Sequence, residues 1–277
     1  MNHYKIVSDS SSNLFEISSI NYDSVPLKIN AGSKEYIDEK GLDTGEMIRG
    51  LLKEAGGSCT SCPSIGEWMD SFEGGDRIFA VTISSAVSGS NNAASVAAEL
   101  YIEAHPEAKI HVIDSLSTGP EMALIIEKLV EYIRRGMTYE EIIDSIAGYM
   151  ENTHLLFCLE HTDNLVKNGR VSAAAARIAS MLGIRILGQA GKEGTIDPIQ
   201  KCRGEKQTIH AILNKMKSLH FKGGRVRIDH CLNPVAALKL KDMIVNEFRN
   251  AVVEINPTGG LCSYYAEQGG LMIGFES

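Results

Sequence analysis

Small hydroxyl-bearing side chains gather in two short stretches, and each stretch precedes a predicted helix. Residues 59–64 read C-T-S-C-P-S, and residues 84–90 read S-S-A-V-S-G-S. Ser64 with Glu67 forms a capping box, and Ser88 is the expected N-cap of the second helix. Helix N-termini present unpaired N–H groups and a partial positive charge. If the two helix starts converge, the pattern predicts an anion site built from hydroxyls and backbone, without a lysine.

These serines also have a simpler interpretation. Serine and threonine are the usual N-cap residues, so any single cap gives no information about a ligand. Here, however, one predicted strand over residues 77–83 joins the two hydroxyl-rich loops. Two such loops in one strand-linked unit therefore favour a ligand site.

The first half of the chain alternates predicted strands with predicted helices. The strands are expected at residues 5–7, 25–29, 77–83 and 110–114. The helices are expected at residues 43–55, from 64, at 91–104, at 118–136 and at 138–151, with capping pairs at 43/46, 118/121 and 138/141. This alternation predicts a mostly parallel sheet with flanking helices. Ligands of such sheets lie beyond the carboxyl ends of the strands, the position of Ser10, Ser84, Ser88, Ser115 and Ser117.

A second domain is expected to begin near residue 151. We predict an N-terminal α/β domain over residues 1–150 and a mixed α/β domain over residues 151–277. The second domain has predicted strands at residues 154–159, 184–189, 195–202, 226–230 and 251–255, and helices at 162–167, 172–182, 205–219 and 234–248. Residues 191–194 join two of these strands as a hairpin. Residues 261–265 and 271–275 each follow a glycine pair and receive no assignment.

Composition and charge exclude several classes of protein. The 277 residues are 44% hydrophobic and carry a net charge of −8, which argues against nucleic acid and anionic membrane surfaces as partners. No apolar run approaches the roughly 18 residues of a membrane helix, and no export signal is evident. We therefore expect a cytoplasmic protein with six reduced cysteines.

An ordered series of motifs resembles the DegV family of lipid-binding proteins. The series runs S-D-S-S at 8–11, T-S-C-P-S at 60–64, S-S-A-V-S-G-S at 84–90, V-I-D-S at 112–115, N-G-R-V at 168–171, K-C-R-G at 201–204 and G-G-L-M-I-G-F at 269–275. Each motif alone is weak, but the ordered set spans nearly the whole chain.

The resemblance implies that a long-chain fatty acid such as palmitate, stearate or oleate lies in a tunnel between the two domains. It assigns the carboxylate to Thr60, Ser61, Ser88, Gly89 and Ser90. It further implies a non-enzymatic role, without a metal or cofactor, as the acyl-carrying partner of a fatty acid kinase. Arg170 and Arg203 match the arginines associated with that phosphotransfer.

The sequence departs from the family pattern at three positions. Cys62 replaces the usual Gln, Asn168 replaces a Gly, and Tyr265 replaces the His of a His-x-Gly-Pro-Gly motif. Tyr265 can hydrogen-bond a carboxylate, and we include it in the carboxylate site, but it carries no positive charge near neutral pH. The change bears on the kinase role more than on lipid binding.

Two other functions compete with lipid binding. Cys59 and Cys62 form a C-x-x-C next to a helix start, which is typical of redox thiols, although no second pair completes a zinc site. A serine hydrolase would use Ser61, Ser84 or Ser88. The chain contains no Gly-x-Ser-x-Gly elbow, and none of its eight histidines has the sequence context of a general base.

Overall fold

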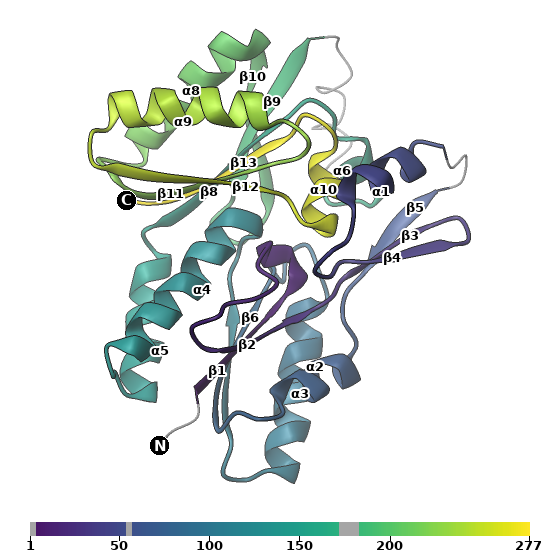
Figure 1. Ribbon diagram of the computed structural model, residues 1–277, viewed down its shortest axis with the longest axis vertical. Helices are drawn as coiled ribbons and strands as arrows, with labels where there is room; N and C mark the ends of the chain where they lie inside the picture. Colours follow the sequence, from purple (N-terminus) through teal and green to yellow (C-terminus); the bar gives the residue numbers. More distant parts are fainter. Residues whose placement is uncertain (1–3, 54–56, 172–182) are drawn as a thin grey trace.

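The computed structural model describes residues 4–53, 57–171 and 183–277, and two large sheets form its framework (Figure 1). Sheet A has the strand order β2-β1-β6-β7, and all neighbouring strands are parallel. Its strands are β1 (Tyr4–Asp9), β2 (Asn21–Val25), β6 (Arg77–Thr82) and β7 (Lys109–Asp114). Because the strands are parallel, their carboxyl ends meet at one edge, as the sequence predicted.

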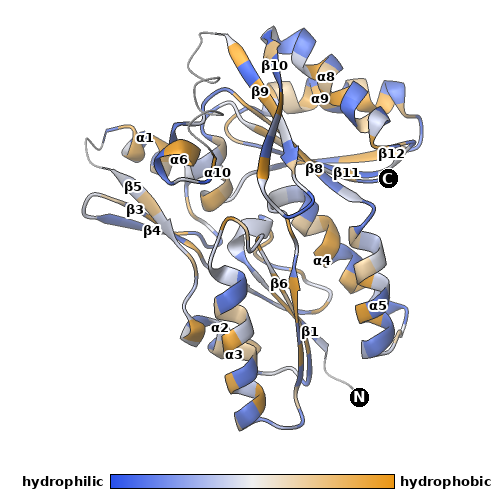
Figure 2. Ribbon diagram, turned by 180° about the vertical axis from the view of Figure 1, so that it is seen from behind, coloured by the Kyte–Doolittle hydropathy of each residue, from blue (hydrophilic) through white to orange (hydrophobic). Residues whose placement is uncertain are grey.

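Helices cover both faces of sheet A. They are α2 (Ile65–Phe72) and α3 (Ser90–Ala104) on one face, and α4 (Gly119–Arg134) and α5 (Tyr139–Met150) on the other. Successive side chains of a strand point to opposite faces of the sheet, so each strand packs against helices on both sides. Val7 packs with α2 and α3, whereas its neighbour Ile6 packs with α4 and α5. Figure 2 shows hydrophobic and hydrophilic residues alternating along α2, α3 and α5, as expected of helices with one buried side.

Sheet C is mixed and has the strand order β10-β9-β8-β13-β11-β12. Its strands are β8 (Thr153–Leu159), β9 (Ile184–Ala190), β10 (Ile196–Arg203), β11 (Gly224–His230), β12 (Ala251–Pro257) and β13 (Leu271–Glu276). The helices α8 (Gly204–Ser218) and α9 (Pro234–Glu247) pack on one face. Leu156 and Cys158 of β8 face these helices, whereas Leu155, Phe157 and Leu159 face the opposite way. The α/β fold class is confirmed, and so are α8, α9 and the β9–β10 hairpin.

A third, antiparallel sheet lies beside the junction of the two halves. Sheet B has the order β4-β3-β5, with β3 (Lys28–Ala31), β4 (Lys34–Ile37) and β5 (Ser58–Ser61). The short helices α1 (Thr44–Leu51), α6 (Asp163–Lys167) and α10 (Gly260–Ala266) gather next to it in both ribbon views, and η1 (Ser10–Ser12) follows β1. Among helices in the described ranges, none is long and apolar enough to cross a membrane.

Several sequence predictions need correction. The segment 25–29 is not one strand, because β2 ends at Val25 and β3 begins at Lys28 in another sheet, with Pro26 between them. Residues 58–61 form β5 rather than a loop, because β3 supplies an edge for pairing. Because of these errors, sheet B was not predicted.

Helix caps were predicted with mixed success. The capping boxes at Ser64 and Thr138 are confirmed. Ser88 is not the N-cap of α3; Gly89 is, and no side chain caps that helix. Thr118 precedes α4 without a side-chain cap bond; its hydroxyl donates to the Ser11 carbonyl at 3.3 Å, and the Glu121 carboxylate accepts from the Ser117 hydroxyl at 2.5 Å.

One predicted helix is not tested, one is described as shorter, and the two segments without an assignment form regular elements. The helix predicted over residues 172–182 lies outside the described residues. The helix expected over 43–55 is described from Thr44 to Leu51. The two unassigned segments form α10 and β13.

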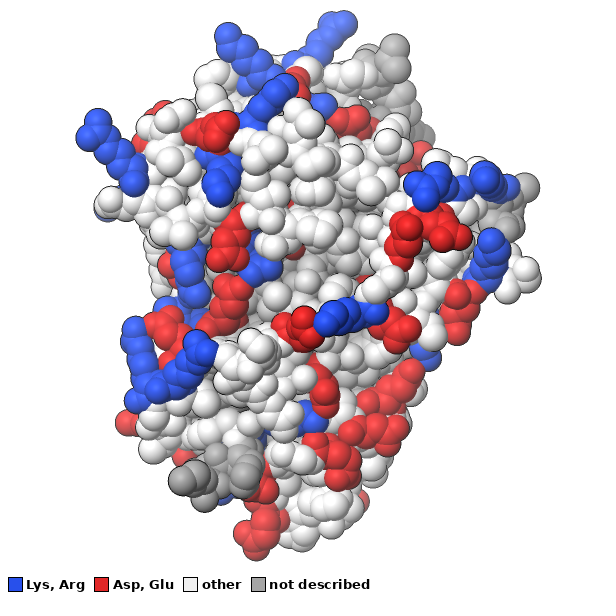
Figure 3. All heavy atoms as spheres, viewed as in Figure 1, with Lys and Arg blue, Asp and Glu red and all other residues white. Residues whose placement is uncertain are grey.

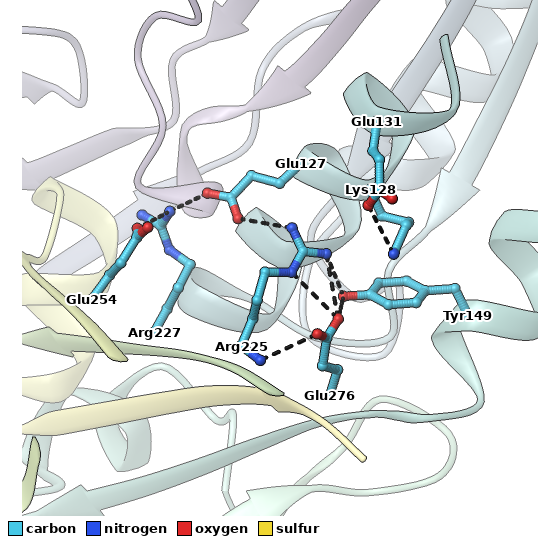
Figure 4. A network of polar contacts seen from close by, with 8 residues as sticks. All are labelled: Glu127, Lys128, Glu131, Tyr149, Arg225, Arg227, Glu254 and Glu276. Atoms are coloured by element: carbon cyan, nitrogen blue, oxygen red, sulfur yellow. Dashed lines mark hydrogen bonds and ion pairs between the residues drawn. The ribbon is translucent and has the colours of Figure 1, made fainter. Parts of the chain in front are cut away.

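Charged side chains join the two halves away from sheet B (Figure 4). Arg225 of β11 pairs with Glu276 of β13 at 3.3 Å and with Glu127 of α4 at 3.7 Å. Arg227, which is largely buried, also pairs with Glu127. The network thus ties α4 to sheet C. The predicted boundary near residue 151 falls between α5 and β8, and the division into residues 1–150 and 151–277 stays a prediction.

Candidate functional site

A cavity of about 290 Å³ lies where the carboxyl edge of sheet A meets sheets B and C. Its volume is close to the lower end of the roughly 300–1,000 Å³ typical of small-molecule pockets. Most of its wall is apolar, because the inward-facing residues of β8 meet side chains from the other elements. The large apolar side chains of the wall are Leu27, Ile83, Leu155, Phe157, Leu159, Leu165, Ile196, Leu261 and Met272.

One part of the wall is polar and combines segments far apart in the sequence. Thr60 and Ser61 come from β5, Ser88 and Gly89 from the loop before α3, Arg170 from the segment after α6, and Tyr265 from α10. The Thr60 hydroxyl lies 2.8 Å from the Tyr265 hydroxyl. Cys62, which directly follows β5, packs closely against Gly89 of the loop before α3. A Cβ atom added to Gly89 would lie 3.3 Å from the Cys62 sulfur. The two hydroxyl-rich stretches therefore converge at one cavity.

Two of these hydroxyls are free to donate to a ligand. In the described part of the chain, the Ser61 hydroxyl makes no hydrogen bond, and the Ser88 hydroxyl only accepts, from the Ser90 N–H at 3.3 Å. Both serines line the cavity. A carboxylate accepts hydrogen bonds and cannot donate them, so available donors of this kind suit it.

Arg170 is the only charged side chain among the described residues that line the cavity. Its Nε donates to the Val87 carbonyl at 3.0 Å, and its Nη1 donates to the Asn168 carbonyl at 2.5 Å. It forms no ion pair with any described carboxylate, although the guanidinium is half-buried. A half-buried guanidinium without a counter-ion favours an anionic ligand.

The other basic residues that the structure describes do not line this cavity. Lys and Arg side chains project from the top of the face in Figure 3, whereas acidic side chains gather towards its lower right. The helices α8 and α9 pack on the face of sheet C opposite to the cavity. Within the described part of the chain, an anion in the cavity can therefore be held only by Arg170 and by uncharged donors.

Tyr265 and the adjacent Tyr264 both form hydrogen bonds to β5. Burial raises the pKa of the Tyr265 hydroxyl, so the side chain stays neutral and can donate a hydrogen bond. The adjacent Tyr264 hydroxyl lies 2.8 Å from the Ser58 hydroxyl and accepts from Asn168 Nδ2 at 2.9 Å. Asn168, which replaces a family glycine, thereby helps to fix α10 against β5.

Two predicted site residues do not line the cavity. Ser90 is fully buried, and its hydroxyl donates to the Asp9 carboxylate at 2.7 Å. Arg203 is exposed at the end of β10, whereas Thr195 and Ile196, at the other end of the hairpin strand, line the cavity. At about 3.3 Å per strand residue, Arg203 lies roughly 20 Å along β10 from Ile196.

Two buried carboxylates that the sequence reading missed hold the site together. Asp9 accepts hydrogen bonds from the Ser11 N–H and hydroxyl, the Ile83 N–H and the Ser90 hydroxyl. Asp38 accepts from the N-terminus of α10, which lies 222 residues further along the chain. The motif at 8–11 pointed to Asp9, but no local sequence signal marks Asp38.

The structure gives little support to the two competing functions. Cys59 lies inside β5 and Cys62 directly follows it, and residues three apart on a strand are roughly 10 Å apart, beyond the Cα separation of a disulfide. No group of three His, Cys, Asp or Glu suited to a metal occurs in the described residues. The described cavity wall contains no histidine that could serve as a general base for Ser61, Ser84 or Ser88.

The fold, with a parallel sheet A and a mixed sheet C, is that of a known family of α/β proteins. A family model described as "Uncharacterised protein, DegV family" matches residues 3–277. A DegV domain-containing protein of Streptococcus gordonii is 39% identical over 277 residues, which cover 99% of each chain. The chain belongs to the DegV family.

Two similar solved structures contain a bound fatty acid. A DegV family protein from Eubacterium eligens, loaded with heptadecanoic acid, has a TM-score of 0.97 at 40% identity, with 99% of each chain covered. The Streptococcus pneumoniae Fatty Acid Kinase (Fak) B3 protein, loaded with linoleic acid, has a TM-score of 0.97 at 39% identity. That match covers 100% of this chain and 99% of the pneumococcal one.

Proposed function

We propose that this protein binds a long-chain fatty acid, with the acyl chain in the apolar cavity and the carboxylate at its polar wall. The observation that carries this proposal is that Arg170, the one charged side chain of the described cavity wall, shares this wall with the hydroxyls of Ser61 and Ser88, which are available as donors. An apolar cavity with one such polar wall matches the shape and charge of a fatty acid. The acids bound by the similar proteins support the same ligand class.

The acyl chain should supply most of the affinity. Burying a CH₂ group contributes about 0.8 kcal/mol, so ~14 methylenes contribute on the order of 11 kcal/mol as an upper bound. A hydrogen bond to a charged carboxylate contributes roughly 1.5–3 kcal/mol. The polar wall therefore sets the orientation and selects an acid, with Thr60, Ser61, Ser88, Gly89 and Tyr265 as the proposed contacts.

We further propose that the bound acid is presented to a fatty acid kinase in the cytoplasm. The sequence contains no Gly-x-x-x-x-Gly-Lys-[Ser/Thr] loop that would hold ATP, so the kinase must supply the phosphoryl donor. Arg170, at the headgroup, would stabilise the negative charge that builds up during transfer. Arg203 is exposed, which suits a contact with the kinase rather than with the lipid.

A titration and a coupled assay test the two parts separately. Delipidated protein should bind palmitate, stearate and oleate with a stoichiometry of one. Acyl phosphate should form from ATP only when a kinase from the same genome is added. Failure to bind any of the three acids overturns the proposed function, whereas acyl phosphate formation by this chain alone overturns the division of labour.

A further inference from the structure

Asp38, which directly follows β4, is a fully buried carboxylate with no cationic partner in the described chain. Its Oδ1 accepts from the Gly260 N–H at 2.6 Å. Its Oδ2 accepts from the Leu261 N–H at 3.0 Å and from the Ser10 hydroxyl at 2.9 Å. Burial raises the pKa of Asp38 to about 6, so the carboxylate is ionised at neutral pH and both oxygens act as acceptors.

The groups that Asp38 binds belong to the cavity wall. The helix α10 carries both Leu261 and Tyr265, which line the cavity. Leu27, another wall residue, donates its N–H to the Ser10 hydroxyl at 3.0 Å, and its carbonyl accepts from the Asp38 N–H at 2.9 Å. One buried carboxylate thus fixes two separate wall segments.

The approach of α10 to Asp38 is close enough to require glycine. A Cβ on Gly260 would lie 2.9 Å from Asp38 Oδ1 and 2.6 Å from the Cδ2 atom of Leu42. Real Cβ atoms are essentially never closer than 3.0 Å to a neighbouring atom, so a side chain there would have to displace the Leu42 side chain, the Asp38 carboxylate or α10 itself. The start of α10 is therefore built around this carboxylate.

We infer that Asp38 is a positioning residue for the ligand's acid headgroup. It acts through α10, which it anchors so that the Tyr265 hydroxyl stays beside Thr60 at the polar wall. This inference rests on the proposed function, because it assigns Asp38 a role in recognising the carboxylate. Leu27 and Leu261, which Asp38 also fixes, cluster with Tyr265 next to the polar wall. The acyl-chain contacts on β8 and β13 are not attached to Asp38 and should not depend on it.

The carboxylate cannot be replaced by an amide without cost. Three donors converge on two oxygens, and the NH₂ group of an asparagine would face at least one of these donors. Asp38→Asn therefore keeps the shape of the side chain but breaks the anchor of α10. We expect the variant to bind palmitate at least tenfold more weakly than the wild type.

Hexadecanol separates a headgroup effect from a general loosening of the protein, because it has the same chain and no carboxylate. The Asp38→Asn variant should bind hexadecanol within about twofold of the wild-type affinity. Asp43→Asn is the matched control, since Asp43 accepts from the Glu46 N–H at the start of α1, which does not line the cavity. Its affinities for both ligands should equal those of the wild type.

A double-variant cycle tests whether Asp38 acts through Tyr265. If it does, Asp38→Asn combined with Tyr265→Phe should bind palmitate within about twofold of the weaker single variant. Losses that multiply would show that the two residues act independently, and would overturn the inference. An equal loss for palmitate and hexadecanol in Asp38→Asn would overturn it as well.

Two further outcomes remain decisive. If circular dichroism shows that Asp38→Asn does not fold, Ser10→Ala removes one of the three donors, and it should weaken palmitate binding about threefold without affecting hexadecanol. No such difference in Ser10→Ala would contradict the inference. If the wild type itself binds palmitate and hexadecanol equally, the carboxylate site of the proposed function fails, whatever the variants do.

Discussion

Two sets of hydroxyl residues follow the strands of this protein, and they differ in what they bind. Ser10, Ser11 and Ser90 are fully buried, and their hydroxyls donate to the carboxylates of Asp9 and Asp38. Ser61 and Ser88 line the cavity, and neither donates to an acceptor within the described residues. We call the first the supporting set and the second the cavity set.

Both sets use the same interaction, a hydroxyl group that donates a hydrogen bond to a carboxylate. In the supporting set the carboxylate belongs to the protein, so the hydroxyls are satisfied by folding. In the cavity set no carboxylate of the described chain is present, and a fatty acid would supply it. Substitutions in the supporting set should therefore change mainly stability, with a smaller effect on binding where they act through Asp38, and substitutions in the cavity set should change binding alone.

The largest effect is expected for Asp9→Ala, which removes the acceptor shared by Ser11, Ile83 and Ser90. Four buried donor groups lose their acceptor, and each unsatisfied group costs roughly 1–3 kcal/mol. We expect the free energy of unfolding to fall by about 4 kcal/mol in urea denaturation. Ser61→Ala is the control and should leave it unchanged; equal stability of both variants would contradict the distinction between the two sets.

The buried carboxylates that the supporting set binds should make the stability of the protein depend on pH. Burial raises the pKa of Asp38 from 3.8 to about 6, so the folded protein binds this proton more tightly than the unfolded chain. The free energy of unfolding should therefore fall as the pH rises from about 4 to about 6, by up to about 1.4 kcal/mol per unit. Denaturation of wild type and Asp38→Asn across this window should show a smaller slope in the variant. An unchanged slope would refute the assignment.

Arg170→Ala should separate transfer from binding. Loss of the guanidinium should reduce acyl phosphate formation with the kinase about 100-fold, because the charge matters most during transfer. Fatty acid affinity should fall by only about tenfold, or roughly 1.4 kcal/mol, because Arg170 is one of several donors at the carboxylate and burial of the chain dominates binding. Steady-state assays and a titration provide both numbers, with Arg170→Lys as the charge-preserving control. If Arg170→Ala abolishes lipid binding, the arginine is needed for the fold or dominates the affinity, and transfer and binding cannot be separated at this residue.

The smallest effect is also the most direct comparison between the two sets. Ser88→Ala should weaken palmitate binding about tenfold, or roughly 1.4 kcal/mol, and leave the melting temperature unchanged. Ser90→Ala, two residues away, should lower the stability by about 1–2 kcal/mol because Asp9 loses a donor. Calorimetry of both variants measures both quantities. The reverse pattern would show that the two sets have been assigned the wrong way round.

Much of the fold could be predicted from local signals. The capping boxes at Ser64 and Thr138, the hairpin through residues 191–194 and the alternation of strands and helices all act within a few residues. The split between Val25 and Lys28 could not be predicted, because it depends on which sheet each residue joins. The pairing of β5 with β3 depends in the same way on a distant partner.

The cavity residues were also only partly predictable, because their roles depend on contacts with distant residues. The sequence marked hydroxyls at strand ends, but it could not separate Ser88, which faces the cavity, from Ser90, which faces Asp9. That distinction depends on the direction of the first turn of α3. Asp38 was missed because its partners on α10 are more than 200 residues away in sequence and meet it only in the folded chain.

The most direct measurement of the central claim is the identity of what the cavity holds after purification. The protein should be expressed in a bacterial host, purified without added lipid, extracted with mild organic solvent and analysed by mass spectrometry. We predict long-chain fatty acid at close to one equivalent per chain, and less than a tenth of that in a matched preparation that has been delipidated. Protein that is lipid-free when purified, and that also fails to bind added palmitate or oleate, would contradict the account.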